Sequence, residues 1–373
     1  MNQKALDLHE KNRGKIEIKS KVDLKTKEDL SLAYTPGVAD VSRLIAQDKS
    51  LLKKYTNVGN SVAIVTDGSA VLGLGNIGPA AAMPVMEGKA ILFKEFANID
   101  AYPICLASQE TEDVIQAVKL ISPGFSGINL EDISAPRCFE IEKRLVAELD
   151  MPVFHDDQHG TAIVVLAGLI NALKVTAKKI EDIYAVINGA GAAGISIANL
   201  LVSYGLKKFA ILDTKGAITR SRSDLNEAKM AIAQKATDVS GGLADVIAGA
   251  DVFIGVSQGH ILTKEMIENM NSQAIVFAMA NPEPEIMPEL AQEAGAAIVA
   301  TGRSDFKNQI NNVLVFPGIF RGLLDNNIKK ITTEMKIKAA QALAGCVANP
   351  TKDEIVPSVL NKEVAQKVAQ AMK

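Results

Sequence analysis

The sequence predicts an α/β protein of two domains, the second built on a parallel sheet. Its 373 residues exceed the usual size of one domain, and a composition of 48% hydrophobic and 22% charged residues is typical of a globular chain. From residue 183 to 301, short apolar runs alternate with helical segments, as parallel strands joined by helical crossovers do. No flexible spacer marks the boundary, which we expect within 158–175 and place after residue 160, giving units 1–160 and 161–373.

Charge and cysteine content exclude several classes of protein. With 40 Lys+Arg against 43 Asp+Glu the net charge is −3, which argues against binding to a phosphate backbone. The chain has no Trp, so a surface that stacks on bases is not expected. Cys105, Cys138 and Cys346 are far apart and form no CxxC pair, which fits a reducing compartment. The N-terminal segment lacks the apolar core of a signal peptide, and we expect a cytoplasmic protein.

One uncharged run, residues 183–206, is long enough to span a membrane. It contains four glycines and changes character midway, from a β-rich half to a helical half. We therefore interpret it as a buried strand, a glycine turn and a buried helix, and expect no membrane span. A second uncharged run, 160–173, is too short to span and is expected to be a core helix.

The pattern of apolar residues assigns the elements in order. The first thirty residues alternate charges and predict an exposed helix and a hairpin. In the rest of the first half, residues 61–78 form a strand-rich apolar segment with glycine turns. The elements expected after it are a short helix and a strand within 90–106, a helix at 113–121, a strand at 125–132, a helix at 135–149 and a strand at 151–157. In the second half, strands are expected at 183–188, 208–213, 251–256, 274–280 and 296–301, with helices between them and a mostly helical segment from 323 to 373.

A GxGxxG motif within the uncharged run predicts a Rossmann-type dinucleotide site. It follows the strand IYAVIN, opens a helix, and is followed 24 residues after its first glycine by Asp213 at the end of the next strand. Glycines allow the tight turn, the helix N-terminus receives the pyrophosphate and the acid accepts from the ribose. The alternative is a glycine-rich packing turn without nucleotide. The cofactor-binding residues expected here are Gly189, Ala190, Gly191, Ala192, Ala193, Gly194 and Asp213.

Two details of the glycine motifs bear on the ligand. Asp213 disfavours a 2′-phosphate and so predicts NAD, whereas Lys215 could pair with that phosphate and permit NADP. A second GxGxxG, at 73–78, has Pro79 directly behind it and no strand and acid partner. It is expected to be a structural loop, or to line a small anion site with its N–H groups.

Two acidic pairs predict a metal site. Glu131–Asp132 and Asp156–Asp157 both follow predicted strands, and open α/β sheets bind ligands at that edge. Burying four acids is costly unless cations offset them, and oxygen ligands suit Mg²⁺ or Mn²⁺. Neighbouring residues can share a metal only if the strand ends there, because side chains alternate along a strand. The alternative is helix caps and surface acids. The HDDQH run at 155–159 lacks the glutamate of HExxH, so zinc hydrolysis is not expected.

Segments spread over nearly the whole chain resemble malic enzymes, specifically the short bacterial form. They are GKIEIKSK (14–21), DLSLAYTPGVA (29–39), VTDGSAVLGLGNIGP (65–79), MPVMEGKA (83–90), GINLEDISAPRCFEIE (127–142), FHDDQHGTA (154–162), GAGAAG (189–194), MANPEPE (279–285) and NNVLVFPGIFRG (311–322). The resemblance implies an N-terminal substrate and metal domain, a Rossmann domain, and oxidative decarboxylation of L-malate to pyruvate and CO₂ with NAD or NADP and Mg²⁺ or Mn²⁺. Oxaloacetate decarboxylation is implied as a secondary activity.

The resemblance also implies roles for single residues, two of which give no signal by spacing. Tyr34, in YTPG, would be the general acid, and Lys89, in EGKA, the general base supported by Asp156. The further roles implied are metal binding by Glu131, Asp132 and Asp157, a place beside the nicotinamide for Asn281, and substrate contact by Lys89, Asn281 and Asn312. One departure is Ser69–Ala70, where larger relatives carry an arginine that grips a malate carboxylate.

The chemistry sets a condition on Lys89. A base that works near neutral pH must have a pKa roughly three units below the ordinary value of lysine, about 10.4. Burial and a metal ion would lower the pKa, and Asp156 would oppose them. Two rival functions use the same cofactor motif: a hydroxy-acid or amino-acid dehydrogenase without decarboxylation, and a non-catalytic NAD-binding module. A homodimer is expected, with Tyr34 serving either its own subunit or its neighbour.

Overall fold

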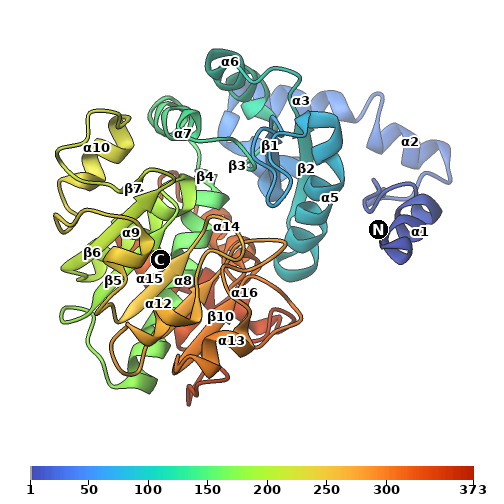
Figure 1. The fold of residues 1–373 in the computed structure, drawn as a ribbon. Coiled ribbons are helices and arrows are strands. Elements are labelled where there is room, and N and C mark those ends of the chain that lie inside the picture. The colour runs from blue at the N-terminus through green and yellow to red at the C-terminus, as the bar shows by residue number, and fades with distance from the viewer. Residues whose placement is uncertain (1) are drawn as a thin grey trace.

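The computed structural model describes residues 2–373 and contains two sheets, one in each half of the chain (Figure 1). The first sheet is entirely parallel, with strand order β2–β1–β3–β4. Its strands are β1 (Ser61–Thr66), β2 (Asp100–Cys105), β3 (Gly127–Leu130) and β4 (Val153–His155). Three of the four are buried along their whole length, as parallel strands covered on both faces are.

The second sheet has the order β10–β9–β8–β5–β6–β7 and is parallel except for the antiparallel edge strand β7. Reversal of chain order between β5 and β8 creates the crevice in which such sheets bind ligands. The strands are β5 (Tyr184–Asn188), β6 (Lys208–Asp213), β7 (Gly216–Ala217), β8 (Val252–Gly255), β9 (Ile275–Ala278) and β10 (Ile298–Thr301).

Helices cover both sheets and form a separate N-terminal segment. In the first half they are α1 (Gln3–Asn12), α2 (Lys27–Ala33), α3 (Val38–Gln47), η1 (Lys49–Leu51), α4 (Leu52–Tyr55), η2 (Asn57–Asn60), α5 (Gly78–Ala97), α6 (Thr111–Ile121), η3 (Ser122–Gly124) and α7 (Arg137–Glu148). The others are α8 (Asp156–Thr176), α9 (Ala192–Tyr204), α10 (Glu227–Ala233), α11 (Leu243–Val246), α12 (Lys264–Glu268), α13 (Pro288–Glu293), η4 (Asn312–Leu314), α14 (Phe316–Asp325), α15 (Thr333–Ala344) and α16 (Glu363–Gln370).

Helix α8 joins the two halves without a linker. It leaves β4 of the first sheet at Asp156 and runs for 21 residues against α9 and α15 of the second half. It is long and apolar enough to cross a membrane, but 72% of its apolar window is buried inside the protein. The helix is therefore the core element around which both halves pack.

Aromatic packing ties the end of the chain to the first sheet. Phe316 and Phe320 of α14 lie 4.8 and 5.3 Å, centroid to centroid, from Phe93 of α5. Phe320 also meets Phe154 of β4 edge to face at 5.9 Å. Helix α14 thus belongs to the second half by sequence and covers the first sheet in space.

Most expected elements are present, and four details differ. The strand, turn and helix expected in the uncharged run are β5 and α9. The expected hairpin is wrong: within residues 2–30 the structure has helices and irregular chain but no strand. The short helix expected after residue 90 begins at Gly78 and contains Pro84. Asp156–Asp157 open helix α8 instead of ending a strand. The two-residue strand β7 was not expected, because its pairing depends on the turn after β6.

Candidate active site

Three carboxylates meet where β3 ends and α8 begins. Glu131, Asp132 and Asp157 each offer an oxygen, and these oxygens lie within 4.8 Å of one another. The strand ends at Leu130, and Asp132 has a left-handed backbone with φ 53°, which Asp tolerates better than most residues. This turn releases the two adjacent acids from the alternation of a strand, so that both reach the same place. The backbone N–H of Asp132 donates to Asp157 Oδ2 at 2.8 Å.

The electrostatics of this carboxylate cluster, defined as Glu131, Asp132 and Asp157, call for a cation. Burial, reinforced by the neighbouring carboxylates, raises the pKa of Asp132 to about 9 and that of Asp157 to about 6. Burial also raises the pKa of Glu131, to about 7, although Lys89 opposes it. Asp132 Oδ2 is buried and has no hydrogen-bond partner among the described residues. Three carboxylate oxygens close together, one of them without a hydrogen-bond partner, fit a hard divalent cation such as Mg²⁺ or Mn²⁺.

Lys89 reaches this cluster from helix α5. Its ammonium group donates to Asp156 Oδ2 at 2.5 Å, pairs with Glu131 Oε1 at 2.9 Å and lies 4.1 Å from the centroid of the Phe316 ring. The side chain is 7% exposed. Burial lowers the pKa of Lys89, but Asp156 and Glu131 outweigh burial and hold the pKa above its ordinary value. The charge around Lys89 therefore has to change before it serves as a base near neutral pH.

Asp156 is held from two sides, and a glycine makes room for it. Besides Lys89, the amide of Asn312 in η4 donates to Asp156 Oδ2. A Cβ at Gly160, one turn later in α8, would lie 1.8 Å from Asp156 Oδ1. The HDDQHG segment therefore needs glycine at its sixth position so that the aspartate folds back over the helix. The spacing Asp156–Gly160 was in the sequence, but only the helical conformation of 156–160 gives it meaning.

Arg137 is a residue of this region that the motifs did not single out. Its guanidinium donates to Asp67 Oδ2 at 2.8 Å and to Ser69 Oγ at 2.9 Å, and Asp67 is fully buried. The next residue, Ala70, donates through its N–H to the carbonyl of Asp132 at 2.9 Å. Arg137 thus fixes the loop that departs from larger relatives. Both terminal nitrogens of its guanidinium are engaged there, with Gln109, Asp67, Ser69 and Ser134.

The GAGAAG loop combines closely packed glycines with an open one. A Cβ at Gly189, where φ is 118°, would lie 2.6 Å from the carbonyl of Val256, and a Cβ at Gly194 would lie 1.7 Å from the carbonyl of Gly189. A Cβ at Gly191 would meet nothing within 4 Å. Gly191 precedes the first turn of the 13-residue helix α9. Two glycines are therefore needed to pack the turn, whereas the third leaves room at a helix N-terminus, which fits a pyrophosphate.

Asp213 stands at the end of β6, but its oxygens are already engaged. Oδ1 accepts from Arg222 and from the N–H of Lys215, and Oδ2 accepts from Arg222 and Lys229 at 3.0 and 2.6 Å. Burial raises the pKa of Asp213, but Arg222 and Lys229 outweigh burial and hold it at about 2. An NAD preference argued from Asp213 alone stays a prediction, since two cations beside this carboxylate are available to a 2′-phosphate.

Asn281 lies at the carboxyl end of β9, where the two halves meet. It is joined to Pro282 by a cis peptide bond, and a Cβ at Gly73 would lie 3.0 Å from its carbonyl. The first GxGxxG loop therefore presses its backbone on the NPEPE loop. The buried carboxylate of Glu285 accepts from the N–H groups of Ala280 and Ser257, which fixes that loop beside β8.

Tyr34 is the one expected catalytic residue that the structure does not bring to the cluster. It caps the C-terminus of α2, its side chain is 67% exposed, and its hydroxyl makes no hydrogen bond within residues 2–373. Helix α2 lies at the edge of the molecule, apart from both sheets (Figure 1). Lys89, Asp156, Asn312 and the carboxylate cluster converge in one chain, whereas Tyr34 points to solvent.

Comparison with known proteins identifies relatives along the whole chain. Residues 11–146 match the model "Malic enzyme, N-terminal domain", and residues 158–373 match "Malic enzyme, NAD binding domain". A bifunctional malic/malolactic enzyme of Bacillus subtilis is 54% identical over 100% of this chain and 92% of its own length. An NAD-dependent malic enzyme of Geobacillus stearothermophilus is 57% identical over 96% and 76%. The crystal structure of an NAD-dependent malic enzyme from Thermotoga maritima superposes with a TM-score of 0.96, 51% identity, and coverage of 99% and 98%.

The raised carboxyl pKa values predict how metal binding depends on pH. A carboxyl group whose pKa is higher in the folded state binds more protons folded than unfolded, so the contribution of these three groups to the stability of the metal-free protein falls as pH rises from about 4 toward 9. A divalent cation needs the deprotonated groups. The increase in melting temperature produced by Mg²⁺ should therefore grow between pH 6 and 8. An Asp132→Asn variant is the control and should respond much less; an increase that is equal at both pH values would contradict the cluster as the metal site.

Substitution of Gly160 by Ala tests whether the position of the Asp156 side chain matters for catalysis. The added methyl group has to displace a carboxylate that lies 1.8 Å from its position. Because a small displacement of a catalytic group reduces the rate of reaction, kcat should fall by at least about tenfold. Gly88→Ala on α5 is the matched control, because its Cβ would meet only the Lys15 ammonium at 3.7 Å. Equal turnover in the two variants would show that the position of Asp156 does not matter.

Proposed function

The chain belongs to the malic enzyme family, and on that premise we propose how its own residues carry out the reaction. It is an oxidoreductase that oxidatively decarboxylates malate, with NAD or NADP as the hydride acceptor. The observation that carries the assignment of roles is the buried Lys89 between Asp156 and the carboxylate cluster. This arrangement supplies a proton acceptor and a cation site side by side, which favours a malic enzyme over a dehydrogenase without decarboxylation and over a module that only binds NAD.

Lys89, as the neutral amine, accepts the proton of the C2 hydroxyl of malate and becomes the ammonium group that Asp156 holds in place. The contact between Lys89 and the Phe316 ring keeps water from that side of the base. Glu131, Asp132 and Asp157 would hold a divalent cation, which when bound would offset these carboxylates beside Lys89 and supply a Lewis acid for the reaction. Asn312, which already contacts Asp156, binds substrate at the same point.

The second half orients the nicotinamide cofactor, which accepts the C2 hydride when bound. We propose that the backbone of 189–194 cradles its pyrophosphate and that Asn281, at the meeting of the two halves, lies beside the nicotinamide and the substrate. Asp213 with Arg222 and Lys229 faces the adenosine ribose; NAD stays our predicted preference. We place the boundary between the substrate and metal unit and the cofactor unit after residue 160, in helix α8. We also propose that the protein is cytoplasmic. Decarboxylation of oxaloacetate is proposed as a secondary activity.

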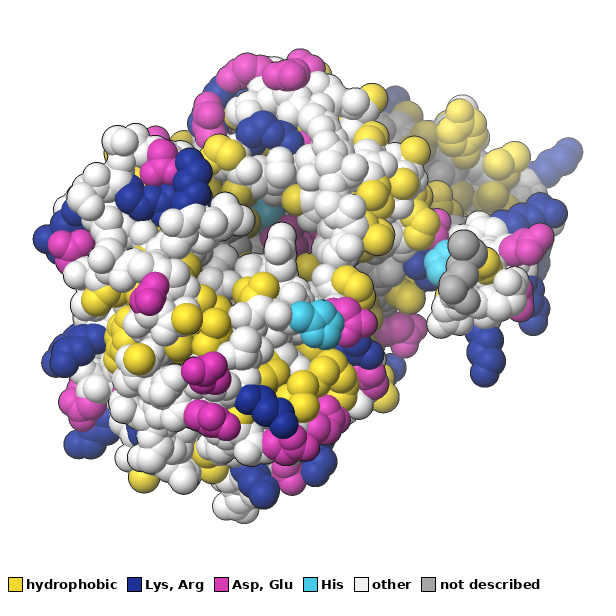
Figure 2. Space-filling view, viewed as in Figure 1, with side chains coloured by type: hydrophobic (Ala, Val, Ile, Leu, Met, Phe, Trp, Pro, Cys, Tyr) yellow, Lys and Arg dark blue, Asp and Glu magenta, His cyan; other side chains and the backbone are white. Residues whose placement is uncertain are grey.

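Tyr34 acts, we propose, in the site of a second copy of the chain, where it protonates C3 of the enol. The N-terminal segment, residues 2–60, has no buried residue in helices α1 to α4 and exposes large apolar side chains. Helices α1 and α2 stand apart from the main body in Figure 1 and Figure 2, whereas the end of the segment contacts it through Asn57 and Asn60. A surface of this kind marks an interface in a soluble protein. The exposed apolar residues of the segment are Leu6, Leu8, Ile16, Ile18, Val22, Leu24, Leu30, Leu32, Tyr34, Val38, Leu44 and Tyr55.

An assay of the purified protein with L-malate, Mn²⁺ and each cofactor tests the function. We expect NADH or NADPH, CO₂ and pyruvate in equal amounts, and no turnover in excess chelator. Reduction of the cofactor with oxaloacetate accumulating and no CO₂ would support the plain dehydrogenase. A kcat/KM for NADP that exceeds that for NAD tenfold would overturn the predicted preference, and would point to Arg222 and Lys229 as the groups responsible.

Substitution of Lys89 by Ala tests the base. Loss of a general base reduces kcat by about 10²–10⁴-fold, and binding of NAD, measured by fluorescence of the reduced cofactor, should persist. Lys94→Ala on the same helix is the matched control: its side chain is half exposed and pairs with Asp100, so kcat should stay within about twofold, as surface changes do. A Lys89→Ala enzyme as active as the control would exclude Lys89 as the base.

Mixing two inactive variants tests the sharing of Tyr34. In a two-fold dimer, a Tyr34→Phe subunit paired with a Lys89→Ala subunit has one site with both groups intact, so random exchange at equal amounts should restore about a quarter of wild-type activity. Sedimentation measures the dimer independently. A dimer that gives no recovery after exchange would place Tyr34 in the site of its own subunit.

A further inference from the structure

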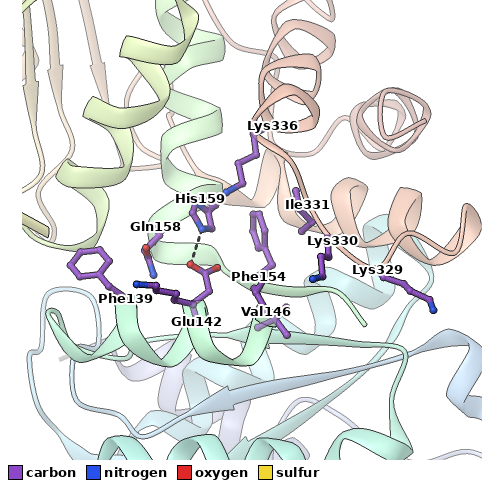
Figure 3. Close-up of a pocket in the computed structure, with 12 residues that line it drawn as sticks. Phe139, Glu142, Val146, Phe154, Gln158, His159, Lys329, Lys330, Ile331 and Lys336 are labelled. Carbon is purple, nitrogen blue, oxygen red and sulfur yellow. Dashed lines mark hydrogen bonds and ion pairs between the residues drawn. The ribbon is translucent and has the colours of Figure 1, made fainter. Parts of the chain in front are cut away.

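A second pocket lies between the two halves of the chain, beside the first turn of α8. Its volume is about 300 Å³, and none of the residues that we assign to catalysis or cofactor binding lines it. Figure 3 shows the side chains around it, which come from α7, β4, α8, the chain before α15 and α15 itself. It is lined by Phe139, Glu142, Lys143, Val146, Val153, Phe154, Gln158, His159, Lys329, Lys330, Ile331 and Lys336.

The positive charges around this pocket exceed the negative ones. Glu142 is the only acid in the lining, and both its oxygens are engaged: Oε1 accepts from the N–H of His155 at 2.9 Å and Oε2 contacts His159 Nε2 at 2.8 Å. Lys143, Lys330 and Lys336 form no ion pair with any residue from 2 to 373. Lys329 differs, because it pairs with Asp150 and points away from the others in Figure 3.

Lys336 is the lysine most deeply set in the pocket. Its ammonium group contacts His159 Nδ1 at 3.0 Å, and burial lowers its pKa while Glu142 opposes that change only in part. The Lys336 side chain is partly buried, and removing an ammonium group from water without a carboxylate partner costs free energy. An anion in the pocket would offset that cost.

The side-chain amide of Gln158 adds a hydrogen-bond donor that has no acceptor among the described residues. Its side chain is 3% exposed, and Nε2 has no hydrogen-bond partner among the described residues, although Oε1 contacts Ser196 Oγ at 3.5 Å. A buried N–H without an acceptor costs free energy, and each such group in a native protein calls for a partner. In Figure 3 this amide lies with Phe139 and Glu142 at the pocket.

The kinds of side chain indicate which anion fits. Three lysines without an ion pair offer more positive charge than one carboxylate balances, whereas a phosphomonoester carries a charge of about −2 near neutral pH. Lysine ammonium groups bind such a phosphate as point charges. The apolar side chains of Val146, Phe154 and Ile331 complete the wall, and the volume exceeds that of a phosphate group alone. We propose that the pocket binds a small organic phosphomonoester, its phosphate facing Lys143, Lys330, Lys336 and the amide of Gln158, its carbon body against the apolar wall.

Calorimetry with glycerol 3-phosphate tests this proposal on the protein saturated with Mg²⁺ and NAD⁺, in which the dinucleotide site is filled. We expect one site per chain, weakened by about tenfold or more in Lys143→Gln and in Lys336→Gln, because each removes a charged contact to phosphate. Lys329→Gln is the matched control and should bind as the wild type does. Lys330→Gln is a further variant should Lys336→Gln fail to fold, as checked by its melting temperature.

Several results would overturn the proposal. One is no binding to the wild-type protein, and another is equal weakening in Lys329→Gln. Inorganic phosphate binding as tightly as glycerol 3-phosphate would exclude an organic ligand, and glutarate binding more tightly would exclude a phosphate. Lys89→Ala separates this site from the catalytic one: it should keep the binding, and loss of binding in that variant alone would place the ligand in the active site.

Discussion

The burial of four carboxylates around one ammonium group is the constraint on which the rest of the structure depends. Glu131, Asp132, Asp156 and Asp157 together carry four negative charges when ionised, and Lys89 offsets only one. Such a group is stable only with a further cation or with protons bound, which is why burial raises the pKa of these acids. The same excess of charge that costs stability creates an affinity for a divalent metal.

The surrounding elements are arranged to hold these charges in place. Both aspartates of α8 lie in its first turn, where the positive end of the helix dipole favours acids. Gly160 leaves the space into which Asp156 folds, and Phe316 covers Lys89 from α14. Since α14 follows the second sheet in the chain, the last part of the sequence completes the site that the first part begins. The two units therefore share one hydrophobic core and are joined through the site as well as through α8.

The expected catalytic groups fall into two sets, one that lies together in a single chain and one that does not. Groups from α5, β3 and α8 are rigidly placed within one chain, whereas the N-terminal segment shows an unburied apolar surface and holds Tyr34 away from the cluster. This division fits an enzyme whose metal and base are complete in each subunit and whose proton donor arrives with a second one. The lysine-lined pocket touches the same turn of α8 through Gln158 and His159, so a ligand there would contact the residues that follow Asp156 and Asp157.

The parallel sheet of the second half, the fold of the glycine loop and the family could all be predicted from the sequence. Buried strands are visible as apolar runs, and the close contacts of Gly189 and Gly194 are local, so their spacing is sufficient to predict them. Features that depend on distant groups became visible in three dimensions: the ion pairs of Arg222 and Lys229 with Asp213, and the exposure of Tyr34. Hydrogen bonds and ion pairs between separate elements depend on side-chain positions in space, and spacing along the chain does not report those positions.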